Sequence, residues 1–264
     1  MYGFDDDYEL FVPEYSVEDT RADLGRIVEY FKGQDYWAEA MYAFLVDYRQ
    51  MAMEVAEFSD AFAVDENTPV DSLPDWMKAE ALGFVKRDWI PMWGRCVFPV
   101  KDVLGQVAGF VGWDPFVKPK YLDSKNYGYK AKQSMLYGME KIPEYYTSKE
   151  PVYVTEGMMD TLYFRWKGFQ AMATLGSYLT PYMRAILRRF GDRLVLIPDN
   201  DETGDHYVAQ AKRELPRAII CQCAFGKDIE GFRKYEEHKY EEQLLHELRN
   251  LTNPFVKTEL LIRR

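Results

Sequence analysis

The sequence is poor in residues that build thiol and imidazole sites. It has 3 cysteines and 3 histidines in 264 residues. Cys221 and Cys223 are the only closely spaced cysteines, and no set of thiols and imidazoles has the spacing of zinc ligands. We therefore expect no zinc, and the few cysteines fit a reducing, cytoplasmic compartment.

Long apolar runs are also missing. No run approaches the roughly 18 residues needed to span a bilayer, so we expect no membrane partner. The first residues, "MYGFDDDYEL", are acidic and lack the basic and apolar regions of a signal peptide.

Positive charge is in deficit, because the formal net charge is −10. The bulk electrostatic field would repel nucleic acid, so a nucleic-acid role requires local basic patches. Residues 117–149 provide one candidate, with three opposing acids and seven lysines: Lys118, Lys120, Lys125, Lys130, Lys132, Lys141 and Lys149. A solvated loop is the simpler interpretation, and phosphate binding is the functional one.

The chain is long enough for a sizeable core, since 47% of its residues are hydrophobic. We expect an acidic lead over residues 1–20 and a mixed basic subdomain over 21–150. Its helices should lie at 21–62 and 75–84, and two strands at 95–100 and 106–113 should form a hairpin.

From residue 151 the pattern becomes an alternation of strands and helices. We expect strands at 152–157, 170–176, 193–199 and 217–223, with helices between them at 159–168, 180–190 and 202–215. Such an order predicts an α/β domain over 151–232, with a parallel sheet and helices on both faces, after an α+β N-terminal half. A charged helix and tail occupy 233–264.

Acidic residues follow the strands of this predicted sheet. Glu156 and Gly157 end the first strand, Asp199 and Asp201 end the third, and Asp228 follows the fourth, with Glu230 close behind. Ligands collect beyond the carboxyl ends of parallel strands. Asp160 lies one turn into the first helix.

A cation would relieve the repulsion in such a cluster. Two carboxylates 4 Å apart repel by about 1 kcal/mol in water and about 4 kcal/mol at an effective dielectric near 20. Oxygen ligands at a sheet edge suit Mg²⁺, with Mn²⁺ as the alternative, and indicate metal-assisted phosphoryl transfer. For "DND" alone, the simpler interpretation is a turn with a helix N-cap.

Two segments resemble a known family. "VYVTEGMMD" followed by "LVLIPDNDETG" resembles the Toprim signature, which occurs in primases, topoisomerases, some nucleases and recombination proteins. The upstream segments "GRCVFPVKDVLGQVAGFVGW", "PKYLDS" and "KQSMLYGMEKI" are similar in order and spacing to the basic subdomain of bacterial and phage DnaG-type primases. The resemblance covers roughly residues 93–230.

The resemblance implies roles for individual residues. Glu156, Asp199 and Asp201 match catalytic, metal-binding acids, and Asp228 matches an acid that completes the metal site. The supporting positions are Asp160, Gly157 and Glu230. Basic positions that grip template or nucleotide are matched by Arg95, Lys120 and Lys132.

The chain also departs from this family. The family ends its second strand in Gly-Gly-Arg, whereas this chain has Val111-Gly112-Trp113, so one expected basic contact is missing. The zinc ribbon that usually begins such primases has no counterpart in the cysteine and histidine spacing.

The resemblance implies the catalytic core of a DNA primase, which makes short RNA primers on a single-stranded DNA template from NTPs, in a bacterial cell or a phage-infected host. A replicative helicase and a separate zinc-ribbon protein would be its partners. Two alternatives remain open: a metal-dependent Toprim nuclease, and a replisome accessory protein that binds single-stranded DNA with little or no activity.

Overall fold

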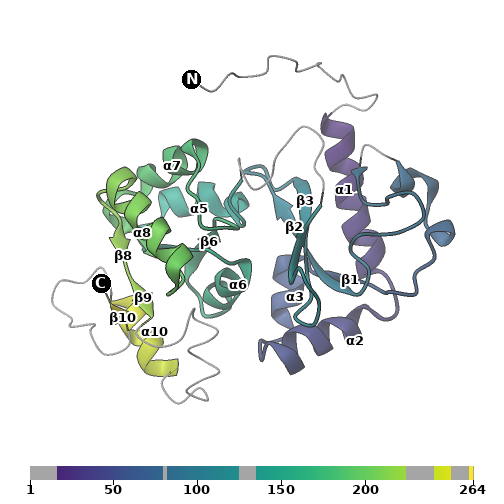
Figure 1. Cartoon of the computed structure of the whole chain (residues 1–264), viewed down its shortest axis with the longest axis horizontal. Helices are drawn as coiled ribbons and strands as arrows, with labels where there is room; N and C mark the ends of the chain where they lie inside the picture. The colour runs from purple at the N-terminus through teal and green to yellow at the C-terminus, as the bar shows by residue number, and fades with distance from the viewer. Residues whose placement is uncertain (1–16, 80–81, 125–134, 224–240, 251–261, 264) are drawn as a thin grey trace.

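The computed structural model describes residues 17–79, 82–124, 135–223, 241–250 and 262–263. These residues form two four-stranded sheets, in the orders β1-β2-β3-β4 and β6-β5-β7-β8, and a short β10-β9 pair. The sheets lie in two lobes side by side (Figure 1). The predicted Lys132, Asp228 and Glu230 lie outside the described residues, as does most of the acidic lead.

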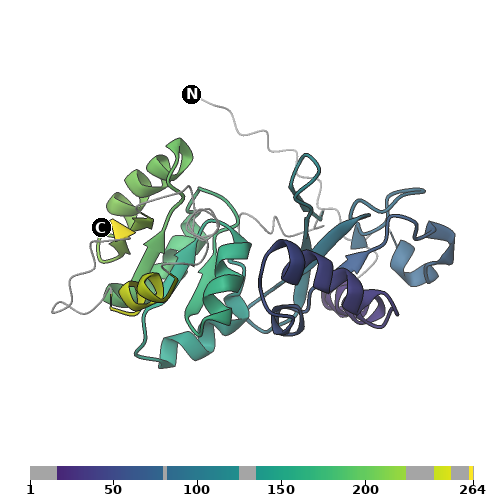
Figure 2. The same cartoon turned by 90° about the horizontal axis from the view of Figure 1, so that it is seen from below.

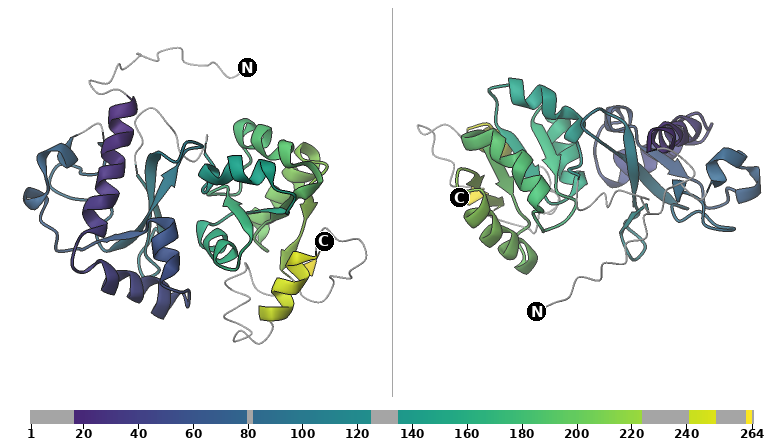
Figure 3. Two further views of the ribbon diagram at one scale, coloured as in Figure 1. Left: turned by 180° about the vertical axis from the view of Figure 1, so that it is seen from behind. Right: turned by 90° about the horizontal axis from the view of Figure 1, so that it is seen from above.

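Helices dominate the first part of the chain, as predicted for residues 21–62. They are α1 (Val17–Lys32), α2 (Trp37–Met41), a π-helix (Tyr42–Tyr48) and α3 (Glu54–Ser59). Helix α1 packs across the antiparallel sheet (Figure 3). There the ring of Phe31 stacks on Phe62, with 5.4 Å between centroids. These two rings therefore belong to the hydrophobic core between α1 and the sheet.

The antiparallel sheet contains the predicted hairpin. Strands β2 (Arg95–Lys101) and β3 (Val107–Trp113) pair with Cys96 opposite Trp113. Two strands of three residues each, β1 (Phe62–Val64) and β4 (Tyr121–Asp123), complete the sheet and were not predicted.

The helix predicted over 75–84 is wrong beyond its first turn. Among the described residues of this range the structure has the short 3₁₀ helix η3 (Asp75–Lys78), which follows another 3₁₀ helix, η2 (Val70–Ser72). Gly83 has a φ of +60°, which an α-helix does not allow. The chain turns there so that Phe84, 1% exposed, reaches Phe31 and Phe110 in the core. Tertiary packing overrides local helix propensity at this point.

The parallel sheet confirms the predicted alternation. Its strands are β5 (Val152–Thr155), β6 (Gln170–Ala173), β7 (Leu194–Ile197) and β8 (Ile219–Ile220). Helices flank the sheet on both faces (Figure 2): α5 (Ile142–Thr147), α6 (Met158–Trp166), α7 (Pro181–Leu187) and α8 (Glu202–Glu214). Two 3₁₀ helices, η5 (Met139–Lys141) and η6 (Arg188–Arg193), precede α5 and follow α7.

Helix boundaries here follow capping chemistry that the sequence displays. The Thr180 hydroxyl accepts a hydrogen bond from the Met183 N–H at 3.2 Å, and Pro181 occupies the first helical position of α7. Gly168, with φ of +84°, follows the end of α6. These two residues therefore account for where α7 begins and where α6 ends.

The C-terminal part adds α10 (Glu241–Arg249) and the antiparallel pair of β9 (Gln222–Cys223) with β10 (Ile262–Arg263). The Tyr153 hydroxyl donates to the Leu248 carbonyl at 2.6 Å and so ties β5 to α10.

Among the helices that the structure describes, none is long and apolar enough to cross a bilayer.

One hydrophobic core joins the two lobes. Buried side chains of β2 and β3, including Trp113, belong to the same cluster as Val154 and Met172 of the parallel sheet. Backbone hydrogen bonds between Tyr137 and Ala173, at 2.8 and 3.0 Å, attach the segment before η5 to β6. The residue boundaries predicted for the domains stay predictions.

Candidate active site

Glu156 lies at the carboxyl edge of the parallel sheet, directly after β5. Strand β7 runs beside β5 with Thr155 opposite Ile197, so the residues after both strands emerge at the same edge. The Asp199 N–H donates to Oε1 of Glu156 at 3.0 Å, and Glu156 is only 8% exposed. The structure thus brings Glu156 against the backbone of the "DND" turn, as the strand order predicts.

Asp201 has a structural function in the same turn. Its Oδ1 accepts a hydrogen bond from the Gly204 N–H at 2.9 Å and caps the N-terminus of α8. A carboxylate there is stabilised by the helix dipole. The simpler interpretation of "DND", a turn with an N-cap, therefore holds for Asp201 while Asp199 contacts Glu156.

Gly204 permits α8 to start this close to the turn. A Cβ atom at position 204 would lie 1.9 Å from the Asp199 carbonyl oxygen, which is far inside any van der Waals contact. The glycine allows the helix to pack on the backbone that also binds Glu156.

Polar side chains hold the turn after β5. The Thr155 hydroxyl donates to the Gly157 carbonyl at 2.8 Å and lies 2.8 Å from the Thr161 hydroxyl on α6. Gly157 is the N-cap of α6, and Asp160 lies in its first turn. A Cβ on Gly157 would meet an Asp160 carboxylate oxygen at 3.4 Å, so Asp160 lies against the Glu-Gly turn.

The donor chemistry of these acids fits a hard divalent cation, because all three strand-end residues offer carboxylate oxygens. Among the residues that the structure describes, however, no three histidine, cysteine, aspartate or glutamate side chains gather closely enough to hold a metal ion. Asp228, the predicted fourth ligand, lies outside the described residues. The carboxylate oxygens are therefore suitable ligands for a divalent cation, but the residues that the structure describes do not bring three such side chains together.

Tyr207, which no signal in the sequence singled out, is buried on the same helix as Gly204. It comes from α8, is fully buried, and its hydroxyl has no hydrogen-bond partner among the described residues. Burial raises the pKa of the Tyr207 hydroxyl, the charge of Glu156 raises it further, and Thr174 opposes the rise. The Tyr207 hydroxyl is therefore held in its neutral form.

Arg95, predicted to grip nucleic acid, is buried in the antiparallel sheet. Its guanidinium donates to the carbonyls of Pro119 and Lys120 at 3.0 and 3.2 Å. Burial lowers the pKa of Arg95, and the charge of Asp114 acts in the opposite direction. The structure thus uses Arg95 to attach β2 to the segment that precedes β4. Lys120 itself is exposed, with its ammonium 5.9 Å from the Tyr121 ring centre.

Trp113, where the family pattern has arginine, is a core residue. It is fully buried, and the guanidinium of Arg49 lies 4.6 Å from its ring centre. Rings of Phe44 and Tyr48 also contact it, with centroids at 5.9 and 5.6 Å. The substitution therefore exchanges a basic position for aromatic packing.

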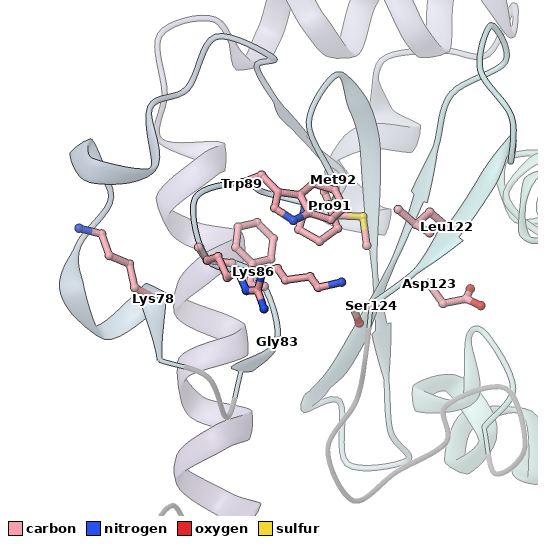
Figure 4. Close-up of a pocket in the computed structure, with 12 residues that line it drawn as sticks. Lys78, Gly83, Lys86, Trp89, Pro91, Met92, Leu122, Asp123 and Ser124 are labelled. Atoms are coloured by element: carbon pink, nitrogen blue, oxygen red, sulfur yellow. The ribbon is translucent and has the colours of Figure 1, made fainter.

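A second site that the sequence did not single out is a pocket of about 700 Å³ beside the antiparallel sheet. Basic and aromatic side chains line it, including Lys78, Lys86, Arg87 and Trp89 (Figure 4). Trp89 is 41% exposed, and the Lys86 ammonium lies 5.7 Å from its ring centre. The segment "VKRDW", with three charged residues next to a tryptophan, is the part of the sequence that could have indicated this pocket.

Residues 153–231 match the family model described as Toprim-like. A DNA primase of Helicobacter pylori is 33% identical over 125 residues, which is 47% of this chain and 22% of that protein. A DNA primase of Deinococcus radiodurans is 36% identical over 115 residues, which is 42% of this chain and 20% of that protein. The chain thus matches about a fifth of the length of these relatives.

Solved structures extend the similarity to most of the chain. The RNA polymerase domain of Mycobacterium tuberculosis primase DnaG aligns with a TM-score of 0.71 at 17% identity, covering 89% of this chain and 83% of that one. The E. coli primase catalytic core aligns with a TM-score of 0.68 at 20% identity, covering 92% and 85%. The chain has the fold of a DnaG-type primase catalytic core. Its Toprim domain implies use of a divalent metal ion, and the predicted mixed α/β architecture is confirmed.

Proposed function

We propose that this chain is the catalytic core of a DNA primase, which joins NTPs into short RNA primers on single-stranded DNA. One observation carries the proposal: Glu156 and the "DND" turn meet at the carboxyl edge of a Toprim sheet that shares its core with a primase-like antiparallel sheet. Relatives named DNA primase support the same chemistry.

The proposed metal ion is Mg²⁺, which Mn²⁺ could replace. Glu156, Asp199 and Asp201 would hold it, together with Asp228. When bound, the ion would neutralise the triphosphate of an incoming NTP and assist ionisation of the attacking 3′-hydroxyl.

The chain's own residues prepare this edge. The Asp199 N–H fixes one oxygen of Glu156, and the buried position of Glu156 restricts access of water to it. One Asp201 oxygen fixes the first turn of α8, so the acids are held on rigid elements. Such preorganisation is what a site for charge developing at phosphorus requires.

The basic pocket supports a template-binding role. Lys86 and Arg87 offer cations to phosphates, and Trp89 offers an exposed ring on which a base can stack. A DnaG primase catalytic domain of similar fold has been solved bound to single-stranded DNA. We assign the template of this chain to the pocket and to Lys120, with Lys132 as a further contact. Arg95 would act by fixing the segment that carries Lys120.

A priming assay tests the proposal. Purified protein, single-stranded template, labelled NTPs and Mg²⁺ should yield short RNA. Glu156→Gln and Asp199→Asn should lower the yield by at least about 100-fold, because each removes a charged oxygen donor from the metal site. The matched control is Asp192→Asn, which removes an exposed carboxylate before the start of β7, at the opposite end of the strand.

The outcomes separate the alternatives. Unchanged yield in the Asp199 variant would contradict the assignment of the site. Cleavage of the template would indicate a Toprim nuclease. An absence of any RNA, even after a replicative helicase and a zinc-ribbon protein are added, would favour the accessory role.

A further inference from the structure

A further pocket, of about 430 Å³, lies where β2 begins and β3 ends. Its volume is within the range of ligand pockets. Aromatic rings and carboxylates dominate its wall, which is formed by Ala43, Phe44, Asp47, Tyr48, Gly94, Asp114 and Phe116. We call it the acidic aromatic pocket.

The acidic aromatic pocket and the basic pocket lie on opposite faces of the antiparallel sheet. Phe44 and Tyr48 pack against the core cluster that contains Trp113. Phe84 and Met92, which line the basic pocket, belong to the other cluster, on the side that α1 covers. The two pockets share no lining residue and can therefore bind different ligands.

The π-helix Tyr42–Tyr48 forms most of the wall of the acidic aromatic pocket. It provides Ala43, Phe44, Asp47 and Tyr48, all of which are exposed or half-buried. Its buried residue, Leu45, anchors it in the core. π-Helices are rare and occur frequently at functional sites, so this wall is a candidate for a binding role.

Phe116 is held at the rim with its ring in solvent. It is 80% exposed, the most of any large apolar side chain among the described residues. The Asp114 carboxylate accepts a hydrogen bond from the Phe116 N–H at 2.8 Å, and the Tyr48 ring meets the Phe116 ring edge to face, with 5.3 Å between centroids. Exposed apolar surface that is gathered in a pocket, here with Phe44, is typical of an interaction site.

The charged groups of the acidic aromatic pocket are both carboxylates. Asp47 is exposed and Asp114 is half-buried, and neither forms an ion pair within the part of the chain that the structure describes. Arg95 acts on Asp114 electrostatically, but its guanidinium donates to the carbonyls of Pro119 and Lys120. Carboxylates beside aromatic rings repel phosphate and attract a cation, because the ring faces bind cations as well.

We infer that the acidic aromatic pocket is a docking site for a partner protein, which inserts an arginine or lysine side chain from a basic, partly apolar segment. The cation would lie between the rings and the carboxylates of Asp47 and Asp114, and the apolar neighbours would cover Phe116. Nucleic acid is a poor occupant, because its phosphates would lie against both carboxylates. The inference does not rest on the proposed function, since it gives these residues no part in joining nucleotides.

A pair of fluorescently labelled peptides tests the inference. The first is a short peptide of leucine, alanine and two arginines. The second carries citrulline in place of each arginine, which keeps the shape of the side chain and removes its charge. We expect saturable binding of the arginine peptide in fluorescence anisotropy, and binding of the citrulline peptide that is weaker by at least about 10-fold.

Variants of the pocket locate the binding. Asp47→Asn and Asp114→Asn should each weaken binding of the arginine peptide about 3-fold to 5-fold, the effect of one exposed ion pair. Asparagine at 114 keeps an oxygen that can accept from the Phe116 N–H. Phe116→Ala should weaken binding by a similar factor and leave stability in urea unchanged, because the ring is exposed.

Asp71→Asn is the matched control. It removes an exposed carboxylate that lies in η2, outside the acidic aromatic pocket. It should leave the affinity for the arginine peptide unchanged. An equal loss in this variant would reduce the binding to a general attraction by a protein of net charge −10, and would overturn the inference.

The other outcomes also decide the question. An absence of saturable binding, or equal affinity for the two peptides, would overturn the inference. Phe116→Ala would overturn it by weakening single-stranded DNA binding, which would place nucleic acid in the pocket, or by abolishing self-association in sedimentation, which would place a second copy there. Specific binding of the arginine peptide to a protein that makes no RNA would support the inference and contradict the proposed function.

Discussion

Gly204 is the residue on which the geometry of the "DND" turn depends most directly. A helix position normally gains from alanine, because glycine costs about 1 kcal/mol there. At position 204 the added Cβ would lie 1.9 Å from the Asp199 carbonyl oxygen, so either the turn or the helix must move. The Asp199 carbonyl is a backbone group and cannot rotate away as a side chain can. The clash should therefore cost more than the helix propensity of alanine contributes, and the substitution should destabilise the fold.

We predict that Gly204→Ala lowers the free energy of unfolding by about 2 kcal/mol or more, in the range found for overpacked sites. It should also lower priming activity, because the Asp199 N–H would move away from Glu156. Urea denaturation and the priming assay measure the two effects.

Gly25 provides the matched control for this substitution. It lies inside α1, and a Cβ there would meet nothing within 4 Å. Gly25→Ala should therefore raise the free energy of unfolding by about 0.5–1 kcal/mol and leave priming unchanged. A stabilising effect of both alanine substitutions would contradict the close contact at Gly204.

At the scale of secondary-structure elements, Asp60 connects α3 to α1 and to β2. It ends α3 in a left-handed conformation with φ of 54°, pairs with Lys32 of α1 at 2.6 Å, and also pairs with Lys101 of β2. Burial alone would raise the pKa of Asp60, but the hydrogen bonds and charges of Lys101 and Lys32 outweigh it and lower the pKa. The carboxylate form therefore stabilises the fold.

The sign of the pH dependence follows from this lowered pKa. Asp60 contributes its full stability above the ordinary aspartate pKa of about 3.9, and the contribution disappears as the pH falls through the lower folded value. Asp60→Asn keeps a residue that tolerates the left-handed conformation and removes the charge. We expect it to lower the free energy of unfolding by about 1 kcal/mol at pH 7, and by progressively less as the solution becomes acidic.

Urea denaturation between pH 7 and pH 2.5 measures this difference. Asp192→Asn is the comparison, because its exposed ion pair with Arg217 should contribute little. A cost of Asp60→Asn that stays constant down to the lowest pH would contradict the charge-based explanation.

The individual strands and helices differ in how well the sequence predicts them. The hairpin at 95–113 and the alternation after residue 151 were predictable, because the strands there are mostly apolar runs that end at turn residues and helix α7 carries its own cap. Strands β1 and β4 have three residues each, too few for a period to show. The helix predicted over 75–84 failed because Gly83 and the burial of Phe84 depend on partners distant in sequence.

For the candidate site, the strand order was sufficient to place Glu156 and Asp199 together. It could not reveal that Asp201 caps α8, that Arg95 is buried against Pro119, or that Tyr207 is fully buried. Each of these depends on which side of an element faces its neighbour at a given residue. The basic pocket depends likewise on bringing Lys78 and residues 83–92 against β4.

At the scale of the whole molecule, the distribution of charge determines how nucleic acid can bind. A net charge of −10 opposes approach of nucleic acid, whereas the pocket concentrates Lys86 and Arg87 around an exposed tryptophan. Template binding should therefore depend on few local phosphate contacts and on stacking, instead of a general electrostatic attraction. Salt dependence separates these two contributions, because counterion release affects the phosphate contacts alone.

We predict that Lys86→Ala weakens single-stranded DNA binding and makes the slope of log affinity against log salt shallower by about 0.7, the value expected for one lost phosphate contact on a single strand. Trp89→Ala should weaken binding by about 1–3 kcal/mol without altering the slope, because stacking releases no counterions. Lys212→Ala, an exposed lysine in the last turn of α8, should change neither quantity. Fluorescence anisotropy with a labelled oligonucleotide over a salt series gives all three values. Equal slopes for Lys86→Ala and the unsubstituted protein would place the template elsewhere than this pocket.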